Sequence, residues 1–464
     1  MSARLAVVSL AAALVGGSVA GAAQPPAIST LAGVAGVPGF AGDGGPANAA
    51  RLASPHGVAV DAQGNVYIAD TGNDRVREVT SAGRISTFVE TPAPGGIAVD
   101  GQGNVLVAAT DDERVLKVSQ AGVTTTVAGT GQAGYSGDGG PATSAALDGP
   151  SAVAVGPGGS VYIADTGNDR VRRIAPDGTI ATVAGTGGRG FSGDGGGATA
   201  ATLAGPAGLT VDARGDLYIA DVLNNRVRKV APDGTMTTLA GSGRRGRSGD
   251  GGRATAAALD TPAGVAVDGS GNVYIADAGN ARVRRVSPAG TITTVAGGGT
   301  MGYLGDFVPA NLVQLIRPVA LAAGARETLY VADGDTVREV GPAATTGPLV
   351  WKALGGDVTC GLAGGPVKQV LCNSRHIPAP PRSRSDEGDP GFAYLRPAGR
   401  PSRARLSQYS WVGLGSIRTV AVRPGRTWRI RGTGIACRIG RRAVRCANGS
   451  HHGFTITRRA YRPF

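Results

Sequence analysis

The sequence contains little charge, few aromatic residues and few cysteines. Of its 464 residues, 17% are charged, 4% are aromatic and only four are cysteines. Binding of single-stranded nucleic acid depends on aromatic stacking platforms, so this composition argues against nucleic acid as a partner. Beyond the N-terminus no apolar run approaches the roughly 20 residues that a membrane-spanning helix needs. No transmembrane segment is therefore expected in the mature chain.

Glycine, in contrast, is abundant. The chain has 78 glycines without a collagen period, and they fall at turn positions between runs that are typical of strands. The length exceeds that of one ordinary domain. These features predict an all-β protein with many turns and more than one domain.

The N-terminus has the features of a secretory signal peptide. Residues 1–22 hold one arginine, an apolar stretch over 5–19, and the small residues Ala20, Gly21 and Ala22. This order indicates cleavage after Ala22. A membrane anchor is the alternative, but the apolar stretch is short for one. We expect a protein that is secreted or associated with the cell surface.

One unit, GNVYIADTGNDRVREV at residues 64–79, recurs along the chain. Its alternating β-branched and aromatic residues on either side of an Asp/Gly/Asn turn predict a hairpin. Copies are spaced by 39 residues once and then by 56 residues four times, and each copy has four strand-like pieces. This pattern predicts a six-bladed β-propeller. The residues that close the second strand of each blade are Asp70, Ala109, Asp165, Asp221, Asp277 and Asp333.

The repeated block PxGVAVDxxGNVYIADxxNxRVRxV resembles the NHL repeat family. It occurs at residues 55–79 and 262–286 and, with small changes, at 150–174. The spacer GYSGDGGPATSAAL at 134–147 is similar to linkers of exported bacterial NHL proteins and of the teneurin-type NHL group. The resemblance covers residues 28–340. It implies an NHL β-propeller over 28–342 that acts as a binding platform, and it says less about the ligand.

The ends of the repeat region predict how the ring closes. The sixth copy has no fourth strand after Val340, whereas an orphan strand, ISTLAG, stands at residues 28–33 before the first copy. We expect residues 28–31 to complete the sixth blade beside the strand at 336–340.

The turns between second and third strands and the long GDGG spacers are expected on one face of the ring, the loop face. Blade 2 alone is preceded by a short connection, TPAPGG, so the ring of spacers should have a gap there. Blade 2 also departs from the turn motif with the acidic run Asp111, Asp112 and Glu113. This run is either a solvated turn or part of a ligand-binding face.

The other turns carry an Asp and an Arg that we interpret as structural, with the carboxylate capping the turn and pairing with the Arg. Ligand binding by these residues is the alternative. We also considered calcium at the spacer aspartates, but one carboxylate per loop is too few for a hard cation. No cofactor is therefore expected. The turn pairs are Asp70 with Arg75, Asp165 with Arg170, Asp221 with Arg226 and Asp277 with Arg282, and the spacer aspartates are Asp43, Asp138, Asp194 and Asp250.

Catalytic propellers of some families gather metal ligands at the mouth of the central channel. The positions expected there are His56, Gly95, Ser151, Ala207, Ala263 and Val319. Only His56 and Ser151 could bind a metal or move a proton, and the His-rich zinc site of peptide-amidating lyase relatives is missing. The sequence favours a binding platform for protein or glycan without catalysis. The alternative is a lyase or lactonase-like hydrolase on the loop face near blade 2. The predicted ligand face comprises Asp111, Asp112, Glu113, His56 and Ser151.

The last part of the chain, residues 343–464, differs from the propeller in charge. It contains 21 Lys and Arg against 4 Asp and Glu, a net charge of +17, while the remainder carries about −4. Two cysteine-containing hairpins predict disulfides between Cys360 and Cys372 and between Cys437 and Cys446 in a small β-rich domain. Zinc is the alternative, but neither pair has CxxC spacing. The charge could hold the protein to anionic cell-wall polymers, or arginine is simply its solubilising residue. We expect a monomer.

Overall fold

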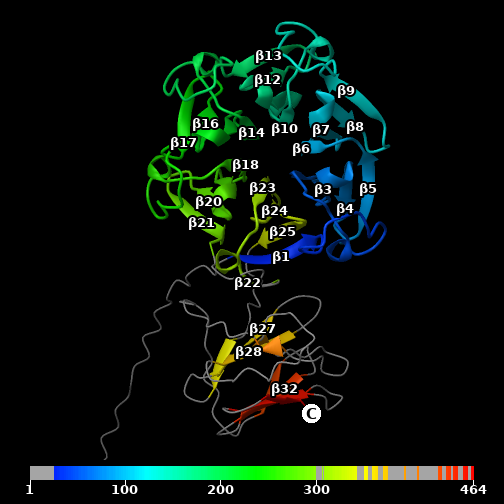
Figure 1. Ribbon diagram of the computed structural model, residues 1–464, viewed down its shortest axis with the longest axis vertical. Coiled ribbons are helices and arrows are strands. Elements are labelled where there is room, and N and C mark those ends of the chain that lie inside the picture. The colour runs from blue at the N-terminus through cyan, green and yellow to red at the C-terminus, as the bar shows by residue number, and fades with distance from the viewer. Residues whose placement is uncertain are drawn as a thin grey trace, which may run out of the picture.

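The computed structural model describes residues 26–298, 306 and 308–341, together with the backbone of short strands between residues 350 and 463. In the first part, six antiparallel sheets, five of four strands and one of five, stand around a central axis as the blades of a propeller (Figure 1). The predicted all-β propeller is confirmed.

Within each blade the strands run from the axis outward in chain order, apart from the closing strand of blade 6. Blade 1 consists of β2 (Gly57–Val60), β3 (Val66–Asp70), β4 (Arg75–Val79) and β5 (Ile85–Glu90). Blade 2 consists of β6 (Pro94–Val99), β7 (Val105–Ala109), β8 (Arg114–Val118) and β9 (Thr124–Ala128). Blade 3 consists of β10 (Pro150–Val155), β11 (Val161–Asp165), β12 (Arg170–Ile174) and β13 (Ile180–Ala184). Blade 4 consists of β14 (Pro206–Val211), β15 (Leu217–Asp221), β16 (Arg226–Val230) and β17 (Met236–Ala240).

Blade 5 consists of β18 (Pro262–Val267), β19 (Val273–Asp277), β20 (Arg282–Val286) and β21 (Ile292–Gly297). Blade 6 consists of β23 (Pro318–Ala323), β24 (Leu329–Asp333), β25 (Thr336–Gly341) and β1 (Ala27–Ala32), with the short β22 (Val308–Pro309) outside β1.

Short 3-10 turns connect these strands. Five follow the second strand of a blade: η2 (Thr71–Asn73), η3 (Thr110–Asp112), η6 (Thr166–Asn168), η8 (Val222–Asn224) and η10 (Ala278–Asn280). Five lie in the spacers: η1 (Ala47–Ala49), η4 (Ala142–Ser144), η7 (Ala198–Ala200), η9 (Ala254–Ala256) and η11 (Ala310–Leu312). One more, η5 (Pro157–Gly159), joins the first two strands of blade 3.

The second strand of each blade is buried on both faces because neighbouring blades pack against it. All five residues of β3, with sequence VYIAD, are buried, and Ile68 has no exposed surface. Burying such a side chain stabilises the fold by about 1.5–3 kcal/mol. Each hydrophobic cluster lies between two adjacent blades and includes side chains from both. The repeats therefore bury one another's faces, as the recurring hairpin predicts.

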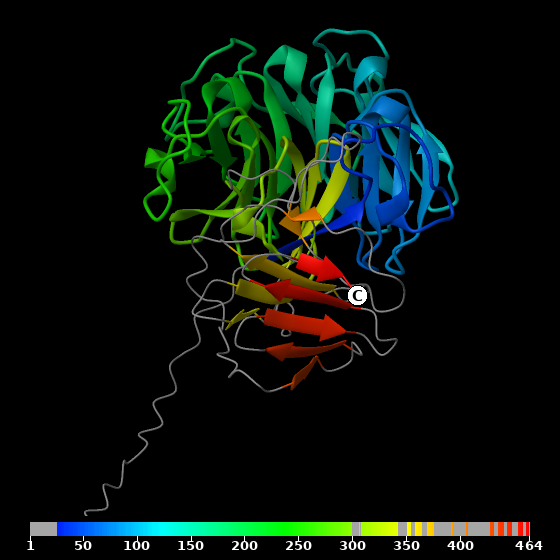
Figure 2. The same cartoon turned by 60° about the horizontal axis from the view of Figure 1, so that its bottom comes forward.

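The ring closes with a strand from the N-terminal side of the propeller. β1 pairs antiparallel with β25, with Ile28 opposite Val340, and lies along it in both views (Figures 1 and 2). Ile28 is fully buried. The predicted closure of blade 6 is confirmed.

Beyond the propeller the structure describes short strands. They are β26 (Val350–Ala353), β27 (Val358–Ala363), β28 (Gln369–Ser374), β29 (Gly391–Phe392), β30 (Arg405–Leu406), β31 (Thr427–Ile430), β32 (Ile435–Ile439), β33 (Ala443–Ala447), β34 (Gly453–Thr457) and β35 (Tyr461–Pro463). The backbone register places Cys360 opposite Cys372 and Cys437 opposite Cys446.

Three sequence-based predictions lie outside this description. The signal peptide at 1–22 and the side chains of all four cysteines are not among the described residues, so the two disulfides and the stapled domain remain predictions. Among the residues that are described, none belongs to a helix long and apolar enough to cross a membrane.

Candidate functional site

The spacers determine which side chains of the turns are accessible on the loop face. A spacer is the connection of about 20 residues that precedes a blade, at residues 33–54, 129–149, 185–205 and 241–261, and in part at 308–317. Each begins and ends beside the turns: the Asn73 side-chain amide donates to Gly39 O (2.9 Å), and the backbone N–H of Gly72 donates to Ala53 O (2.9 Å). The two ends of the spacer therefore share the loop face with the turns, as predicted. Its GDGG segment does not, because Ala142, just after GDGG in the blade 3 spacer, donates its backbone N–H to Gly178 O in the turn before the outer strand β13 (2.9 Å).

Between its two ends, each spacer descends along the outer strand of the blade that follows it. In blade 3, Gly139 N donates to Ile180 O (2.8 Å) and Ile180 N donates to Gly140 O (3.0 Å). The 3-10 turn of the spacer then inserts small apolar side chains between the blades, where Ala142 and Leu147 are buried. The spacers thus cover the outer edges of blades 1, 3, 4, 5 and 6 rather than forming a ring of free loops.

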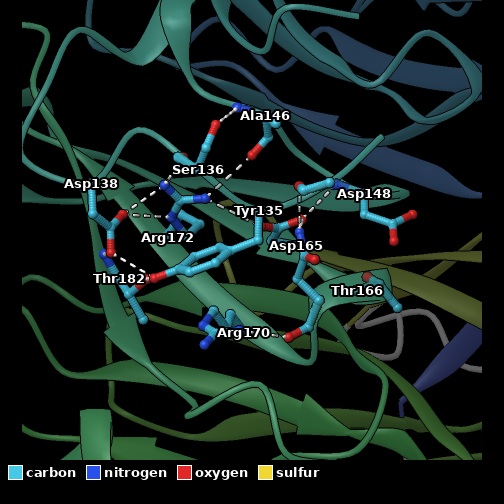
Figure 3. Close-up of polar contacts among 12 residues, drawn as sticks. Tyr135, Ser136, Asp138, Ala146, Asp148, Asp165, Thr166, Arg170, Arg172 and Thr182 are labelled. Carbon is cyan, nitrogen blue, oxygen red and sulfur yellow. Dashed lines mark hydrogen bonds and ion pairs between the residues drawn. The ribbon is translucent and has the colours of Figure 1, made fainter. Parts of the chain in front are cut away.

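A fully buried arginine on the third strand anchors each of these spacers. In blade 3, Arg172 donates from Nη2 to Asp138 of the spacer (2.6 Å) and from Nη1 to Asp165 at the end of β11 (3.4 Å), as Figure 3 shows. It also donates to the spacer carbonyl of Ser136 (3.0 Å). The equivalent arginines are Arg77, Arg172, Arg228, Arg284 and Arg338, each at most 1% exposed.

The buried aspartate at the end of the second strand completes the anchor. Asp165 accepts hydrogen bonds from the backbone N–H of Asp148 (2.8 Å) and from the side-chain amide of Asn168 (2.9 Å). The same amide donates to the spacer carbonyl of Gly134 (2.8 Å). Charge-assisted bonds of this kind are the stronger class of hydrogen bond. The Asp, Asn and Arg of the repeat therefore form one receptor for the spacer.

This network corrects the predicted partner of the turn aspartate. The structural role is confirmed, but Asp70 and Asp165 pair with Arg77 and Arg172, two residues beyond the predicted Arg75 and Arg170. Asp221 and Asp277 likewise pair with Arg228 and Arg284, in place of Arg226 and Arg282.

The outer arginines have a different contact. Arg170 lies over the ring of Tyr135 with its guanidinium carbon 3.8 Å from the ring centroid, and Arg75 and Arg226 lie in the same way over Phe40 and Phe191. These aromatic rings belong to the spacers, so both arginines of a strand hold the spacer in place.

The spacer aspartates include one that the sequence did not reveal. Asp43, Asp138, Asp194 and Asp250 each pair with a buried arginine, and Asp306 pairs with Arg338 (3.4 Å) in blade 6. The segment around Asp306 reads GDFVPAN instead of GDGGPAT, so the glycine pair that marks the other spacers is missing. In these positions the carboxylates act as ion-pair partners within the fold.

The pKa values of the two carboxyl groups of an anchor are shifted in opposite directions. Burial raises the pKa of Asp165 above its ordinary value, and hydrogen bonds from Asp148 and Asn168 oppose it only in part. Partial burial also acts to raise the pKa of Asp138, but hydrogen bonds from Thr182 and Tyr135 and the charge of Arg172 outweigh it and lower the pKa.

This difference predicts a pH-dependent effect of Asp138→Asn. Because the pKa of Asp138 is lower in the folded state, the stabilisation from its charge is fully present above the ordinary aspartate pKa of 3.8 and is lost as the pH falls through the folded pKa. At pH 7 we expect the variant to lose about 1–3 kcal/mol of unfolding free energy. Denaturant unfolding at several pH values measures this difference, which should vanish in strong acid; a difference that stays constant with pH would contradict the assignment.

Blade 2 lacks the spacer and also the Asp, Asn and buried Arg that form its receptor. Ala109 replaces the buried aspartate, Asp112 replaces the asparagine and Leu116 replaces the buried arginine. No spacer hydrogen bond reaches β9 among the described residues. A buried arginine there would have no spacer carboxylate to pair with, which explains why all three positions change together. The predicted gap in the ring of spacers is confirmed.

The three residues of the acidic run in blade 2 have different environments. Glu113 accepts a hydrogen bond from the backbone N–H of Gly149 (2.6 Å), as Asp74 does from Ala93 and Asp169 from Gly205. Asp111 is exposed and Asp112 is half-buried at the loop face.

At the channel mouth, small residues are required because adjacent innermost strands approach closely. A Cβ atom added to Gly95 would lie 2.9 Å from Ser151 O, and one added to Gly208 would lie 2.4 Å from Ala263 O. The hydroxyl of Ser151 lies 2.6 Å from Thr166 Oγ1. At Gly95 and Gly208, therefore, the neighbouring backbone leaves no room for a side chain.

His56 is exposed at this mouth, near the charge of Arg317. Partial burial of the imidazole lowers the pKa of His56, and the nearby Arg317 guanidinium lowers it further. No hydrogen bond joins it to Ser151 among the described residues. Nowhere in residues 26–298, 306 and 308–341 do three His, Cys, Asp or Glu side chains converge on a point where a metal ion could bind.

Solved propellers share this fold at low sequence identity. A Bacteroides thetaiotaomicron protein of unknown function aligns with a TM-score of 0.55 and 20% identity, covering 68% of this chain and 76% of that one. An auxiliary nutrient-binding protein from the same species aligns with a TM-score of 0.52 and 13% identity, covering 69% and 78%. These similarities show the fold alone.

Sequence comparison is more specific. Mouse teneurin-3 is 29% identical over 210 residues, which is 41% of this chain and 7% of teneurin-3, and mouse teneurin-4 is 27% identical over 263 residues, 52% of this chain and 8% of teneurin-4. The chain thus spans less than a tenth of these relatives. The family model for the teneurin NHL domain matches residues 36–93, 93–175, 176–246 and 243–303. Because these matches cover more than half of the chain and coincide with the propeller, the protein belongs to the teneurin NHL domain family.

Proposed function

We propose that this protein is an exported binding platform that holds protein or cell-surface glycan ligands on the loop face of its propeller, beside blade 2. The observation that carries the proposal is the uncovered turn of blade 2. In blade 3, a Cβ atom at Gly167 would lie 2.4 Å from Asp148 of the returning spacer. Asp111 stands at the same repeat position in blade 2, where no spacer returns, and its side chain is exposed.

The chemistry of this turn favours ligands with cationic or hydroxyl groups. Where spacers are present, the turn side chains hydrogen-bond within the fold, as Asn168 does. Asp111 and Asp112 have no hydrogen-bond or ion-pair partner among the described residues, so their carboxylates can accept hydrogen bonds from a ligand. Lysine or arginine side chains of a protein and sugar hydroxyls both meet this requirement.

Substitution of Asp111 and Asp112 tests the site. Arrays of secreted proteins and cell-wall glycans, probed with the purified chain, should yield a ligand whose affinity falls about tenfold or more in Asp111→Asn/Asp112→Asn. Asp177→Asn is a matched control, because Asp177 is an exposed turn carboxylate outside the blade 2 turn. Equal loss in both variants, or loss in neither, would contradict the proposed site.

The basic C-terminal region supports a second contact with the surroundings of the cell. Residues 343–464 carry a net charge of +17, which attracts anionic polymers over long range. Retention of the chain on beads bearing an anionic polymer should persist at physiological salt. If retention is already lost at low ionic strength, the arginines serve solubility instead.

The alternative function is a lyase or lactonase-like hydrolase with its site on the same face. The exposed side chain of His56 at the channel mouth favours it, because a histidine in such a place can accept or donate a proton. Metal analysis of the purified protein separates the two functions. A stoichiometric, tightly held metal would favour the enzyme, and a metal-free protein that binds its ligand would favour the platform.

A further inference from the structure

The outer strand of blade 2 is an open β edge. Thr124, Thr125 and Thr126 of β9 are exposed, and Val123 just before them has 61% of its surface exposed. At the equivalent first position of the other outer strands stand Ile28, Ile85, Ile180, Met236 and Ile292, each at most 1% exposed. The difference follows from the missing spacer.

The covered blades show which backbone groups of an outer strand point away from its own sheet. Ile180 exchanges both backbone hydrogen bonds with the spacer, and the N–H of Thr182 donates to Asp138 of the spacer (3.1 Å). The first and third residues of the strand therefore face outward. By the repeat register, these residues in blade 2 are Thr124 and Thr126.

These backbone groups of β9 have no hydrogen-bond partner in the part of the chain that the structure describes. The strand also lacks the features that protect edges, because residues 120–128, QAGVTTTVA, contain neither a charged residue nor proline. Threonine and valine have high β propensity. The edge is ready to accept another strand.

We propose that β9 pairs antiparallel with β9 of a second copy of this chain, forming a two-fold symmetric dimer. Thr124 would exchange its outward backbone hydrogen bonds with Thr126 of the second copy, and Thr125 would face its own counterpart across the axis. In this register Val123 lies opposite Val127 of the second copy. The interface is self-complementary, as two-fold symmetry requires.

A second copy fits this edge better than a segment resembling the spacers. Each spacer presents an aspartate to a buried arginine, whereas blade 2 has Leu116 at the arginine position, so an acidic segment would place an unpaired carboxylate there. β9 is neutral and extended and opposes no like charges when it pairs with itself.

Charge substitution at the two-fold axis tests the dimer in the purified full chain. Sedimentation velocity over a concentration series should show a monomer–dimer equilibrium for the wild type. Thr125→Lys and Thr125→Glu each place like charges opposite one another, and each should weaken dimerisation about tenfold or more. An equimolar mixture of the two variants should restore it as a heterodimer.

Thr237→Lys provides the matched control. Thr237 is the exposed residue at the same position of the covered strand β17 in blade 4, so its substitution should leave the dimer unchanged. A wild type that stays monomeric at every concentration, or a dimer that survives both charges at position 125, would overturn the proposal.

Discussion

Arg172→Leu is expected to lower the free energy of unfolding by about 3–5 kcal/mol, the cost of breaking a buried ion pair by removing one partner. The substitution leaves Asp165 buried without its counter-charge and Asp138 without its main partner. Denaturant unfolding followed by circular dichroism measures the loss. Leu116→Arg in blade 2 should also destabilise the protein, because the new guanidinium would meet no spacer carboxylate.

Arg172→Leu should lower the free energy of unfolding by less when Asp165 is replaced as well. Blade 2 shows the combination that works without a buried arginine, with Ala109 and Leu116 at the positions of Asp165 and Arg172. In a double-mutant cycle, Asp165→Ala/Arg172→Leu should therefore lose less than the sum of the single variants, by about 1–3 kcal/mol. Additive losses would show that the two side chains act independently.

Ile28→Ala should lower the free energy of unfolding by about 2–5 kcal/mol, as truncation of a buried aliphatic side chain does. Ile28 is fully buried in the cluster between blades 5 and 6 and belongs to the strand that closes the ring. The loss is measured by thermal and denaturant unfolding of the purified chain.

Ser29→Ala on the same strand is the control for Ile28. Ser29 is only half-buried, and its substitution should change stability by less than about 0.5 kcal/mol. If both variants were equally harmless, β1 would not contribute to closing the propeller.

The architecture could be predicted from the sequence because its signals are local. Alternation within VYIAD and RVREV marks the strands, and Asp and Gly at the turns mark the reversals. The repeat spacing then sets the number of blades. The closure could be predicted because the sixth repeat lacks a fourth strand after Val340, while the ISTLAG strand belongs to no other repeat. Pairing the two completes the sixth blade.

The partner of the turn aspartate could not be predicted in the same way. Asp70 and Arg75 are direct neighbours across the hairpin, which makes Arg75 the natural choice from local geometry. Arg77 lies on the same side of the strand two residues further along, and only the covering spacer buries it and brings Asp43 to it. Long-range packing therefore decides between two residues that the local pattern treats alike.

A signal for the anchor was nevertheless present in the sequence. Among the six repeats, only blade 2 has no spacer before it. It is also the only repeat with a leucine, Leu116, where the others have the buried arginine of the third strand. The joint loss of spacer and arginine links the two features within a single chain. The exposed carboxylate of Asp111 follows from the same loss, whereas no pattern in the sequence shows that Glu113 hydrogen-bonds to Gly149.

Hydrogen–deuterium exchange of the spacers in Arg172→Leu tests most directly the claim that the repeated Asp, Asn and Arg serve as the spacer receptor. The amides of Gly139 and Ala142 are hydrogen-bonded along blade 3 in the wild type, and those of Gly195 and Ala198 are bonded along blade 4. We predict that the blade 3 spacer loses protection while the blade 4 spacer keeps it. Unchanged protection of the blade 3 spacer, or an equal loss in both, would contradict the account.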